Sequence, residues 1–424
     1  MPKWFWTPSA TAGENPLFQT SNLTLAVVSE TPISFDGRQY LHSPSEGRYI
    51  DGLATAFKEV IIFTYAFRPG DLDYENTATY SFQAPNIRVI EIPLARPGRF
   101  LKLRKAWQMI QSAATLIRHR RGWDIAYIFF PGYIGAMAAL FYRAARRPYM
   151  AYLGSDWPEE AELLIPFQGL LKRPLVPVFR GLVAALQNSA VHGSILTLTA
   201  GRLLSSQYAK QGANAHETIP RLMWDEFRIY EREDTCAGPI IRLLIVANLI
   251  ERKGVTYVIE AVRLLRARTA IDFRCTVVGW GPFEDTLREQ VKNSGLEEVV
   301  TLTGHQTGAD LARHYREADI FAFASFSGEG FPRVLYEAMS QGLPIISTDI
   351  CGISLKLKPN VHALYVPTKD AAAIAEGALT IVENPDLRRA LIANGRAFMQ
   401  AMIAGPRAHE QVVTLLKQTR YAQR

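Results

Sequence analysis

The sequence lacks apolar runs long enough to cross a membrane. None of its hydrophobic stretches reaches the roughly 18 to 20 residues that a spanning helix requires. The largely apolar stretch 159–190 is interrupted by Pro166, Pro174 and Pro177, so it does not predict a spanning helix. We interpret it as a surface that faces a membrane or a partner. Polar residues follow the first six, so no signal peptide is predicted, and we expect a cytoplasmic protein.

Cysteine is scarce as well. The three cysteines, Cys236, Cys275 and Cys351, are odd in number and widely spaced, without a C-x-x-C pair. This pattern indicates neither a disulfide framework nor a thiolate metal site. The eight histidines do not cluster either. We therefore predict a protein without a bound metal or a cofactor.

Acidic residues are outnumbered by basic ones. With 47 Lys and Arg against 40 Asp and Glu, the net charge is +7 and the isoelectric point is near 9.2, which suggests an anionic partner. Nucleic acid, an anionic membrane and a phosphorylated substrate all qualify. The sequence has no zinc finger, no RNA-recognition signature and no long Lys/Arg tract, so we predict no nucleic-acid partner.

The composition is typical of a globular protein, and the length suits two domains. The hydrophobic fraction is 48% and the charged fraction 21%. Strand-like and helix-like segments alternate in both halves, which predicts an α/β protein with two doubly wound parallel-sheet domains facing a cleft. The predicted boundaries are 1–220 for the first domain, 221–240 for a charged linker, 241–405 for the second domain and 406–424 for a last helix.

The most informative stretch is a glycine-flanked loop that follows a predicted buried strand, 320–324. Gly328 and Gly330 let the backbone approach a ligand closely, and Pro332 suits the first position of a helix. The free amides at that helix start carry partial positive charge, so a phosphate can bind there without a metal. These amides belong to the residues near Phe331, Arg333 and Val334. The loop lies at the carboxyl end of a parallel strand, where open α/β sheets bind ligands.

Two carboxylates accompany this anion site. Glu329 lies in the loop, and Glu337 lies on the same helix face as Arg333, about one turn deeper. A carboxylate in that place accepts hydrogen bonds from neutral hydroxyls, so the pair around an anion site describes a sugar nucleotide. The alternative is an ordinary strand-loop-helix with an exposed Arg333–Glu337 ion pair.

The segment Glu-Gly-Phe-Pro-Arg-Val-Leu-Tyr-Glu-Ala at 329–338 resembles the E-x7-E motif of the retaining GT-B glycosyltransferases, in particular the large family 4 group. The resemblance covers the C-terminal half well and the N-terminal half loosely. It implies the GT-B fold, in which the last helix packs back on the first domain. It also implies a metal-independent hexosyltransferase of polysaccharide or glycolipid biosynthesis. Such an enzyme moves a hexose from a nucleoside diphosphate sugar to a hydroxyl of a glycan or lipid-linked saccharide, with retention of configuration.

The resemblance also assigns roles along the donor. Glu329 would hold hydroxyls of the transferred sugar, and Glu337 would hold the ribose diol. Lys253, which precedes Gly254 as in the family, would pair with the diphosphate. Asn248 stands where the family has an arginine, so Arg252 is the candidate to supply the missing guanidinium.

Three further positions complete the predicted site. Gly279 ends a strand and lets the chain turn closely beneath a ligand. His305 follows the strand 299–303, where relatives present backbone groups to the base, although a capping or surface role is the alternative. Many relatives carry a histidine near the end of the strand 148–153, and Asp156 is the candidate substitute here.

A basic amphipathic helix over 99–123 has two interpretations. Its stripe of Leu103, Trp107, Ile110, Ala114 and Ile117 predicts a helix packed on the sheet, with solvated basic ends. The same basic ends suit a face that approaches anionic lipid at the inner face of the membrane. The two interpretations are compatible, because the charges need not share the apolar stripe.

Two other functions remain open for the whole chain. A catalytically silent GT-B subunit would bind a nucleotide sugar or a partner enzyme without turnover, and Asn248 favours it modestly. A nucleotide-sugar epimerase of the same fold would need no acceptor.

Overall fold

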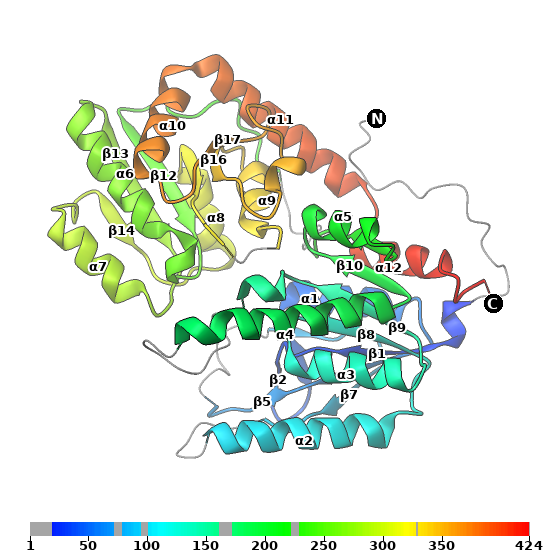
Figure 1. Cartoon of the computed structure of the whole chain (residues 1–424). Helices are drawn as coiled ribbons and strands as arrows, with labels where there is room; N and C mark the ends of the chain where they lie inside the picture. Colours follow the sequence, from blue (N-terminus) through cyan, green and yellow to red (C-terminus); the bar gives the residue numbers. More distant parts are fainter. Residues whose placement is uncertain are drawn as a thin grey trace. The chain divides into compact units, whose positions relative to one another are not determined.

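The computed structural model describes residues 19–71, 79–94, 101–160, 172–221, 229–327 and 330–423, with the backbone alone for 101–106, 160 and 172–174. Within this part of the chain two compact units form. The first takes the described residues up to 221 together with those from 406 onward, and the second takes 229–405 (Figure 1).

The first unit is built on a parallel sheet of seven strands in the order β11-β10-β9-β8-β1-β4-β7. Its interior strand β1 is buried at every residue, as expected for a strand covered on both faces. Leu25 of β1 pairs with Val60 on one side and with Ile125 on the other. The strands are β1 (Thr24–Val28), β4 (Glu59–Thr64), β7 (Ile87–Glu91), β8 (Ile125–Phe130), β9 (Tyr149–Leu153), β10 (Leu196–Thr199) and β11 (Ala215–Glu217).

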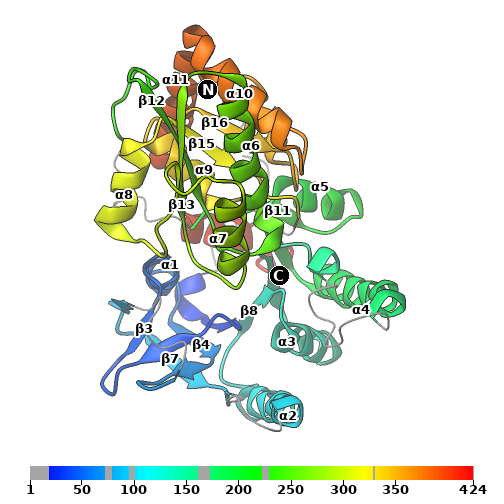
Figure 2. The same cartoon turned by 90° about the vertical axis from the view of Figure 1, so that its left-hand side faces the viewer.

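Helices cover both faces of this sheet. One face packs against α1 and the C-terminal helix α12, whose residues Val412 and Leu416 are fully buried beside Leu53. The other face packs against α3 and α4, which lie side by side in Figure 2. The helices of this unit are α1 (Pro44–Ala54), α2 (Leu101–His119), α3 (Tyr133–Ala144), α4 (Lys172–Gly193), α5 (Arg202–Lys210) and α12 (Ala408–Lys417), with short 3-10 turns at Thr20–Asn22 and Trp157–Glu160.

A small second sheet combines two strands from the polar segment after β1 with two strands that follow β4. Its strand order is β5-β2-β3-β6, and the β2–β3 and β3–β6 pairs are antiparallel. The strands are β2 (Ile33–Phe35), β3 (Tyr40–His42), β5 (Ala66–Phe67) and β6 (Tyr80–Ser81).

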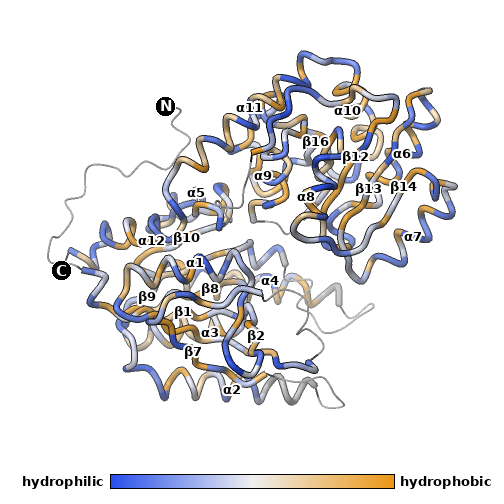
Figure 3. The backbone as a smooth tube through the Cα atoms, turned by 180° about the vertical axis from the view of Figure 1, so that it is seen from behind, coloured by the Kyte–Doolittle hydropathy of each residue, from blue (hydrophilic) through white to orange (hydrophobic). Residues whose placement is uncertain are grey.

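The second unit is a parallel sheet of six strands in the order β14-β13-β12-β15-β16-β17. The helices α6, α7 and α10 cover one face through Val258, Leu287 and Ile374. Tyr315 of α8 stacks on Phe321 of β15 on the opposite face. Figure 3 shows that the strands are among the most hydrophobic segments of both units. The strands are β12 (Ile240–Val246), β13 (Asp272–Val278), β14 (Val300–Leu302), β15 (Ile320–Phe323), β16 (Ile345–Thr348) and β17 (Leu364–Val366). The helices are α6 (Val255–Arg268), α7 (Glu284–Asn293), α8 (Gly308–Glu317), α9 (Arg333–Ser340), α10 (Ala371–Glu383) and α11 (Pro385–Ala404), with 3-10 turns at Glu251–Lys253 and Ile353–Leu355.

The structure corrects the packing interpretation of α2. Trp107 is 59% exposed, Ile110 58% and Ile117 47%, whereas Leu116 on the other side of the helix is buried. The apolar stripe therefore faces away from the sheet, and the expectation that it packs there was wrong. Leu103 lies among the residues whose side chains are not described.

The apolar stretch 159–190 also differs from its prediction. Its second part is the long helix α4, which continues through Pro177. Pro177 lies in the second turn of α4, where a proline removes one backbone hydrogen bond of the helix. No helix in the described part of the chain is both long enough and apolar enough to span a membrane.

Candidate active site

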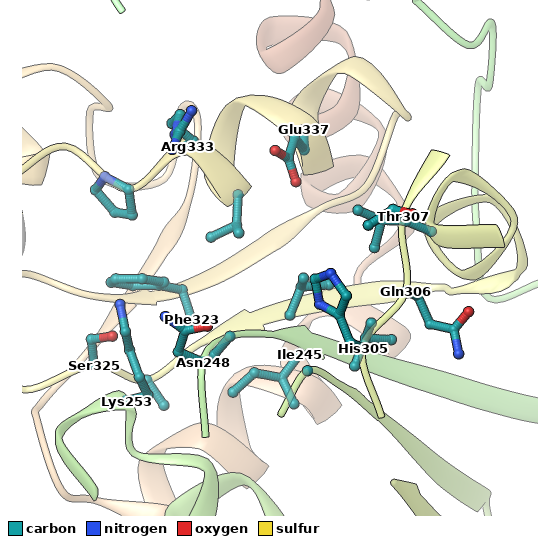
Figure 4. A pocket seen from close by; sticks show the side chains of 18 of the residues that line it. Ile245, Asn248, Lys253, His305, Gln306, Thr307, Phe323, Ser325, Arg333 and Glu337 are labelled. Atoms are coloured by element: carbon teal, nitrogen blue, oxygen red, sulfur yellow. The ribbon is translucent and has the colours of Figure 1, made fainter. Parts of the chain in front are cut away.

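A cavity of about 590 Å³ opens in the second unit at the carboxyl ends of β12, β13 and β15. Figure 4 shows Lys253, Asn248 and Ser325 at one end of it and His305 and Thr307 at the other, with Arg333 and Glu337 along α9 between them. The lining residues are Ile245, Val246, Ala247, Asn248, Lys253, Val278, Gly279, His305, Gln306, Thr307, Leu311, Phe323, Ala324, Ser325, Phe331, Pro332, Arg333, Val334 and Glu337.

The start of α9 forms one wall of the cavity. Pro332 precedes the helix with an extended backbone, φ −70° and ψ 117°, so α9 begins at Arg333. Proline lacks the amide that would otherwise be unpaired at this point. Phe331, Arg333 and Val334 line the cavity beside it. An anion in this wall would meet the partial positive charge that backbone amides gather at a helix N-terminus.

Glu337 is held at the opposite end of this wall by a tyrosine. Its Oε2 accepts a hydrogen bond of 2.7 Å from the hydroxyl of Tyr315. Burial raises the pKa of Glu337, while the Tyr315 hydrogen bond and the charge of Arg333 lower it. The residue is half-buried and lines the cavity, so its carboxylate can receive hydrogen bonds from a ligand.

Lys253 comes from a tight turn between β12 and α6. Gly254 ends this turn in the left-handed region, with φ +69°, and a side chain there would collide with the carbonyl of Ala324. The turn therefore lies directly against the end of β15. Lys253 lines the cavity as a result.

Arg252, next to Lys253, has a different place. It is not among the residues that line the cavity, and its Nη1 donates a hydrogen bond of 3.0 Å to the carbonyl of Ser327. The amide of Phe326 in turn donates to the carbonyl of Arg252 at 2.9 Å. Arg252 thus connects its own turn to the start of the glycine-flanked loop.

The end of the cavity at His305 is formed by backbone that approaches closely. Gly279 has φ +143°, and a side chain there would collide with the carbonyl of Ala247. Its amide donates to the carbonyl of Gly304 at 2.9 Å. These contacts bring the backbones of Ala247, Gly279 and Gly304 close together at the end of the cavity that His305 lines.

The remaining predicted residues lie elsewhere. Gly330 is not among the lining residues, and Glu329 and Gly328 lie outside the described residues. Asp156 belongs to the first unit, where it follows β9 and accepts a hydrogen bond of 2.8 Å from Gln187.

Sequence reasoning missed several residues that the fold brings to the cavity. Gln306, Thr307, Leu311 and Ser325 line it, and Tyr315 supports Glu337 from behind. Tyr315 precedes Glu337 by 22 positions, so no local spacing pairs them. In the sequence, only the position of Tyr315 shortly before a buried strand hints that its side chain packs inside the unit.

Within the described residues, no group of three or more His, Cys, Asp or Glu side chains is arranged to hold a metal ion. Among the described residues, Lys253 and Arg333 are the lysine and arginine side chains that line the cavity.

Comparison with known proteins finds a family match in the second unit. Residues 238–398 match the family model described as glycosyl transferases group 1. The amylovoran biosynthesis glycosyltransferase AmsK of Erwinia amylovora is 36% identical over 140 residues, which are 32% of this chain and 34% of that protein. The putative colanic acid biosynthesis glycosyltransferase WcaL of Escherichia coli (strain K12) is 32% identical over 188 residues, 43% of this chain and 45% of that protein. The chain thus matches less than half the length of these relatives.

Solved structures extend the likeness to nearly the whole chain at the level of the fold. Sucrose-phosphate synthase from Thermosynechococcus elongatus has a TM-score of 0.69 at 18% identity and covers 94% of this chain and 99% of its own. Anabaena Alr3699/HepE in complex with UDP-glucose has a TM-score of 0.64 at 15% identity, covering 94% of this chain and 98% of its own. The two parallel-sheet units are the Rossmann-like domains of the GT-B fold. Residues 238–398, the segment that matches the glycosyl transferases group 1 model, make up most of the second unit.

Proposed function

We propose that this protein is a glycosyltransferase that moves a hexose from a nucleoside diphosphate sugar to a hydroxyl of a glycan or lipid-linked saccharide, with retention of anomeric configuration. One observation carries the proposal: a single cavity collects a lysine, a helix N-terminus and a half-buried carboxylate. These are the groups that a diphosphate and a sugar diol require.

The donor fits the order of groups along the cavity. Lys253 and the amides at the start of α9 bind the diphosphate. A lysine suits this role because its ammonium is a flexible point charge that can approach a phosphate from several directions. Glu337 takes the ribose hydroxyls, and the base lies at the backbone edge near Gly279 and His305.

The chemistry then depends on stabilising the leaving group. The acceptor oxygen bonds to the anomeric carbon while the bond from that carbon to the phosphate oxygen breaks. The departing diphosphate takes the acceptor proton on the same face of the sugar. Lys253 and the α9 amides stabilise the developing negative charge, and their fixed positions mean that little reorganisation is needed. The proposed reaction uses no metal.

The sugar itself is assigned to the loop. Glu329, outside the described residues, holds hydroxyls of the transferred hexose in this proposal, on the strength of the sequence motif. Arg252 supports the loop from Ser327 rather than contacting the diphosphate. Asp156 remains a candidate for contact with the sugar or acceptor.

The relatives indicate a class of pathway. AmsK and WcaL are named for the biosynthesis of amylovoran and of colanic acid, and a phosphatidyl-myo-inositol mannosyltransferase of Mycobacterium leprae is 30% identical over 169 residues. We therefore assign this protein to polysaccharide or glycolipid biosynthesis, with a sugar chain or a lipid-linked saccharide as acceptor.

A donor panel tests the proposal. UDP, GDP and ADP hexoses are added to the full chain in EDTA, and the thermal shift and the release of nucleoside diphosphate with and without an acceptor are measured. We expect one donor to raise the melting temperature and Lys253→Ala to weaken its binding by roughly 10- to 100-fold. Lys292→Ala, at the exposed end of α7, is the matched control and should bind as the wild type does.

The outcomes separate the alternatives. Binding without any release of nucleotide would indicate the silent subunit, and conversion of the sugar without an acceptor would indicate the epimerase. If no nucleotide sugar binds, the proposal is wrong.

The proposal includes contact with an anionic membrane through α2. Its outward stripe of Trp107, Ile110 and Ile117 is the kind of face that inserts at a lipid interface. Exposed Arg118 and Arg120 lie at the end of the helix and suit acidic headgroups. A lipid-linked acceptor would be reached from such a surface.

Flotation with vesicles of phosphatidylcholine and phosphatidylserine tests this contact at low and high salt. We expect the wild type to float at low salt and the Trp107→Glu/Ile110→Glu variant to stay in solution. Leu203→Glu changes a similarly exposed residue on α5 and should float like the wild type. A wild type that stays in solution at low salt would remove the idea.

A further inference from the structure

Tyr315 is fixed at both ends of its side chain. The residue is only 2% exposed, and its ring stacks on Phe321 of β15 at 5.7 Å between centroids with an interplanar angle of 29°. Its hydroxyl donates to Glu337 Oε2 at 2.7 Å. Because β15 fixes the ring, the hydroxyl stands at a defined place behind the carboxylate.

This hydrogen bond acts on the one side chain of the cavity wall that carries negative charge in the described part of the chain. A carboxylate has two oxygens and about four sites for hydrogen bonds. Tyr315 occupies one site on Oε2, which orients the group and leaves the other sites for a ligand. It also favours the ionised form, against the burial that raises the pKa of Glu337.

The contact is more than core filling. A phenylalanine would stack on Phe321 equally well and would need no acceptor. Tyr365 in the same unit offers a comparison, because its hydroxyl donates at 2.6 Å to the carbonyl of Leu357, which is not a cavity residue. Either tyrosine loses one hydrogen bond when it is changed to phenylalanine. Only the Tyr315 substitution removes a hydrogen bond from a residue that lines the cavity, Glu337.

We propose that Tyr315 is a positioning residue that sets Glu337 to accept two adjacent hydroxyls of a ribose, so that the site prefers ribonucleotides to 2′-deoxyribonucleotides. The inference rests on the proposed function, since it assumes a nucleoside diphosphate in the cavity. Tyr315, which lies on α8 and does not line the cavity, would thus contribute to the selection of the donor.

Calorimetry with two variants tests the inference. UDP, GDP and ADP, each with its 2′-deoxy counterpart, are titrated into the wild type, Tyr315→Phe and Tyr365→Phe as full chains. For the nucleotide that binds, we expect Tyr315→Phe to lose roughly three- to tenfold in affinity for the ribo form and much less for the deoxy form. Tyr365→Phe should keep the wild-type ratio between the two. Unfolding curves of both variants report any loss of stability separately.

The pH profile gives a second readout. A diol donates to an ionised carboxylate, so binding should weaken as the pH falls through the pKa of Glu337. Loss of the Tyr315 hydrogen bond raises that pKa further, so the weakening should begin at a higher pH in Tyr315→Phe. Arg333, His305 and Lys253 also face the cavity, but they are the same in all three proteins.

The results separate the two levels of the argument. If a ribonucleotide binds the wild type, but Tyr315→Phe keeps both the wild-type preference for the ribo form and the wild-type pH profile, the positioning role is refuted while the proposed function stands. If none of the nucleotides binds the wild type, the proposed function fails and the inference falls with it.

Discussion

Substitution of Glu337 tests the assignment of the nucleoside end of the cavity. The carboxylate lines the cavity and is held by Tyr315, so two variants separate charge from hydrogen bonding. Glu337→Ala removes both, and Glu337→Gln keeps a polar group of the same size without the charge.

The magnitudes follow from the hydrogen bonds that a diol would make. Each hydrogen bond to a charged acceptor contributes about 1.5 kcal/mol or more, so loss of two costs about 3 kcal/mol, roughly 150-fold in affinity. In Glu337→Gln the amide oxygen still accepts a hydrogen bond, and we expect a loss of about 1.5 kcal/mol, roughly tenfold.

The Glu337→Ala substitution has two opposing effects on the free energy of unfolding. In Glu337→Ala the buried hydroxyl of Tyr315 loses its acceptor, which costs about 1 to 3 kcal/mol. Removal of a carboxylate whose ionised form is disfavoured by burial offsets part of this cost. We therefore expect a folded variant with a modestly lower free energy of unfolding.

The assay is isothermal titration of the nucleoside diphosphate that binds the wild type, at neutral pH, beside urea unfolding of each variant. The expected order of affinity is wild type, then Glu337→Gln, then Glu337→Ala. If both variants bind as tightly as the wild type, Glu337 does not contact the ribose and the donor lies differently in the cavity.

Three other substitutions give independent predictions. Glu329→Ala should abolish transfer while nucleoside diphosphate binding stays within about threefold of the wild type, as seen by calorimetry; a tenfold loss of binding would contradict its assignment to the sugar. Gly279→Ala should place a methyl group against the carbonyl of Ala247 and weaken nucleotide binding more than tenfold, with a destabilisation of about 2 to 4 kcal/mol. Arg221 lies buried over three aromatic rings, with a 2.8 Å ion pair to Glu46, so Arg221→Ala should lower the free energy of unfolding by about 3 to 5 kcal/mol in urea; an unchanged curve would contradict the importance of this contact.

The parallel sheets were predictable because their strands carry a local signal. The segment 320–323 is apolar at every position and 240–246 is apolar apart from Arg242, as expected for strands covered on both faces. Turn residues and helix starts between them then fix the alternating order. The strand-loop-helix that carries Glu337 followed from glycine and proline positions in the same way.

Features that depend on contacts between residues far apart in the chain could not be predicted from the sequence. The strands Ile33–Phe35 and Tyr40–His42 are too short for their pattern to stand out from a polar segment. The stripe of α2 has the spacing of a packed face, yet periodicity alone does not say which face meets the sheet. Arg252 stands beside Lys253 in sequence, but only the fold shows that its guanidinium reaches Ser327.

The central claim is that Lys253 and the start of α9 receive a diphosphate. Calorimetry of the full chain with a nucleoside monophosphate and the matching diphosphate, in EDTA, tests it most directly. We expect the second phosphate to strengthen binding at least tenfold in the wild type and in Lys292→Ala, and we expect most of this gain to disappear in Lys253→Ala. Equal binding of the two nucleotides by the wild type, or an undiminished gain in Lys253→Ala, would contradict the claim.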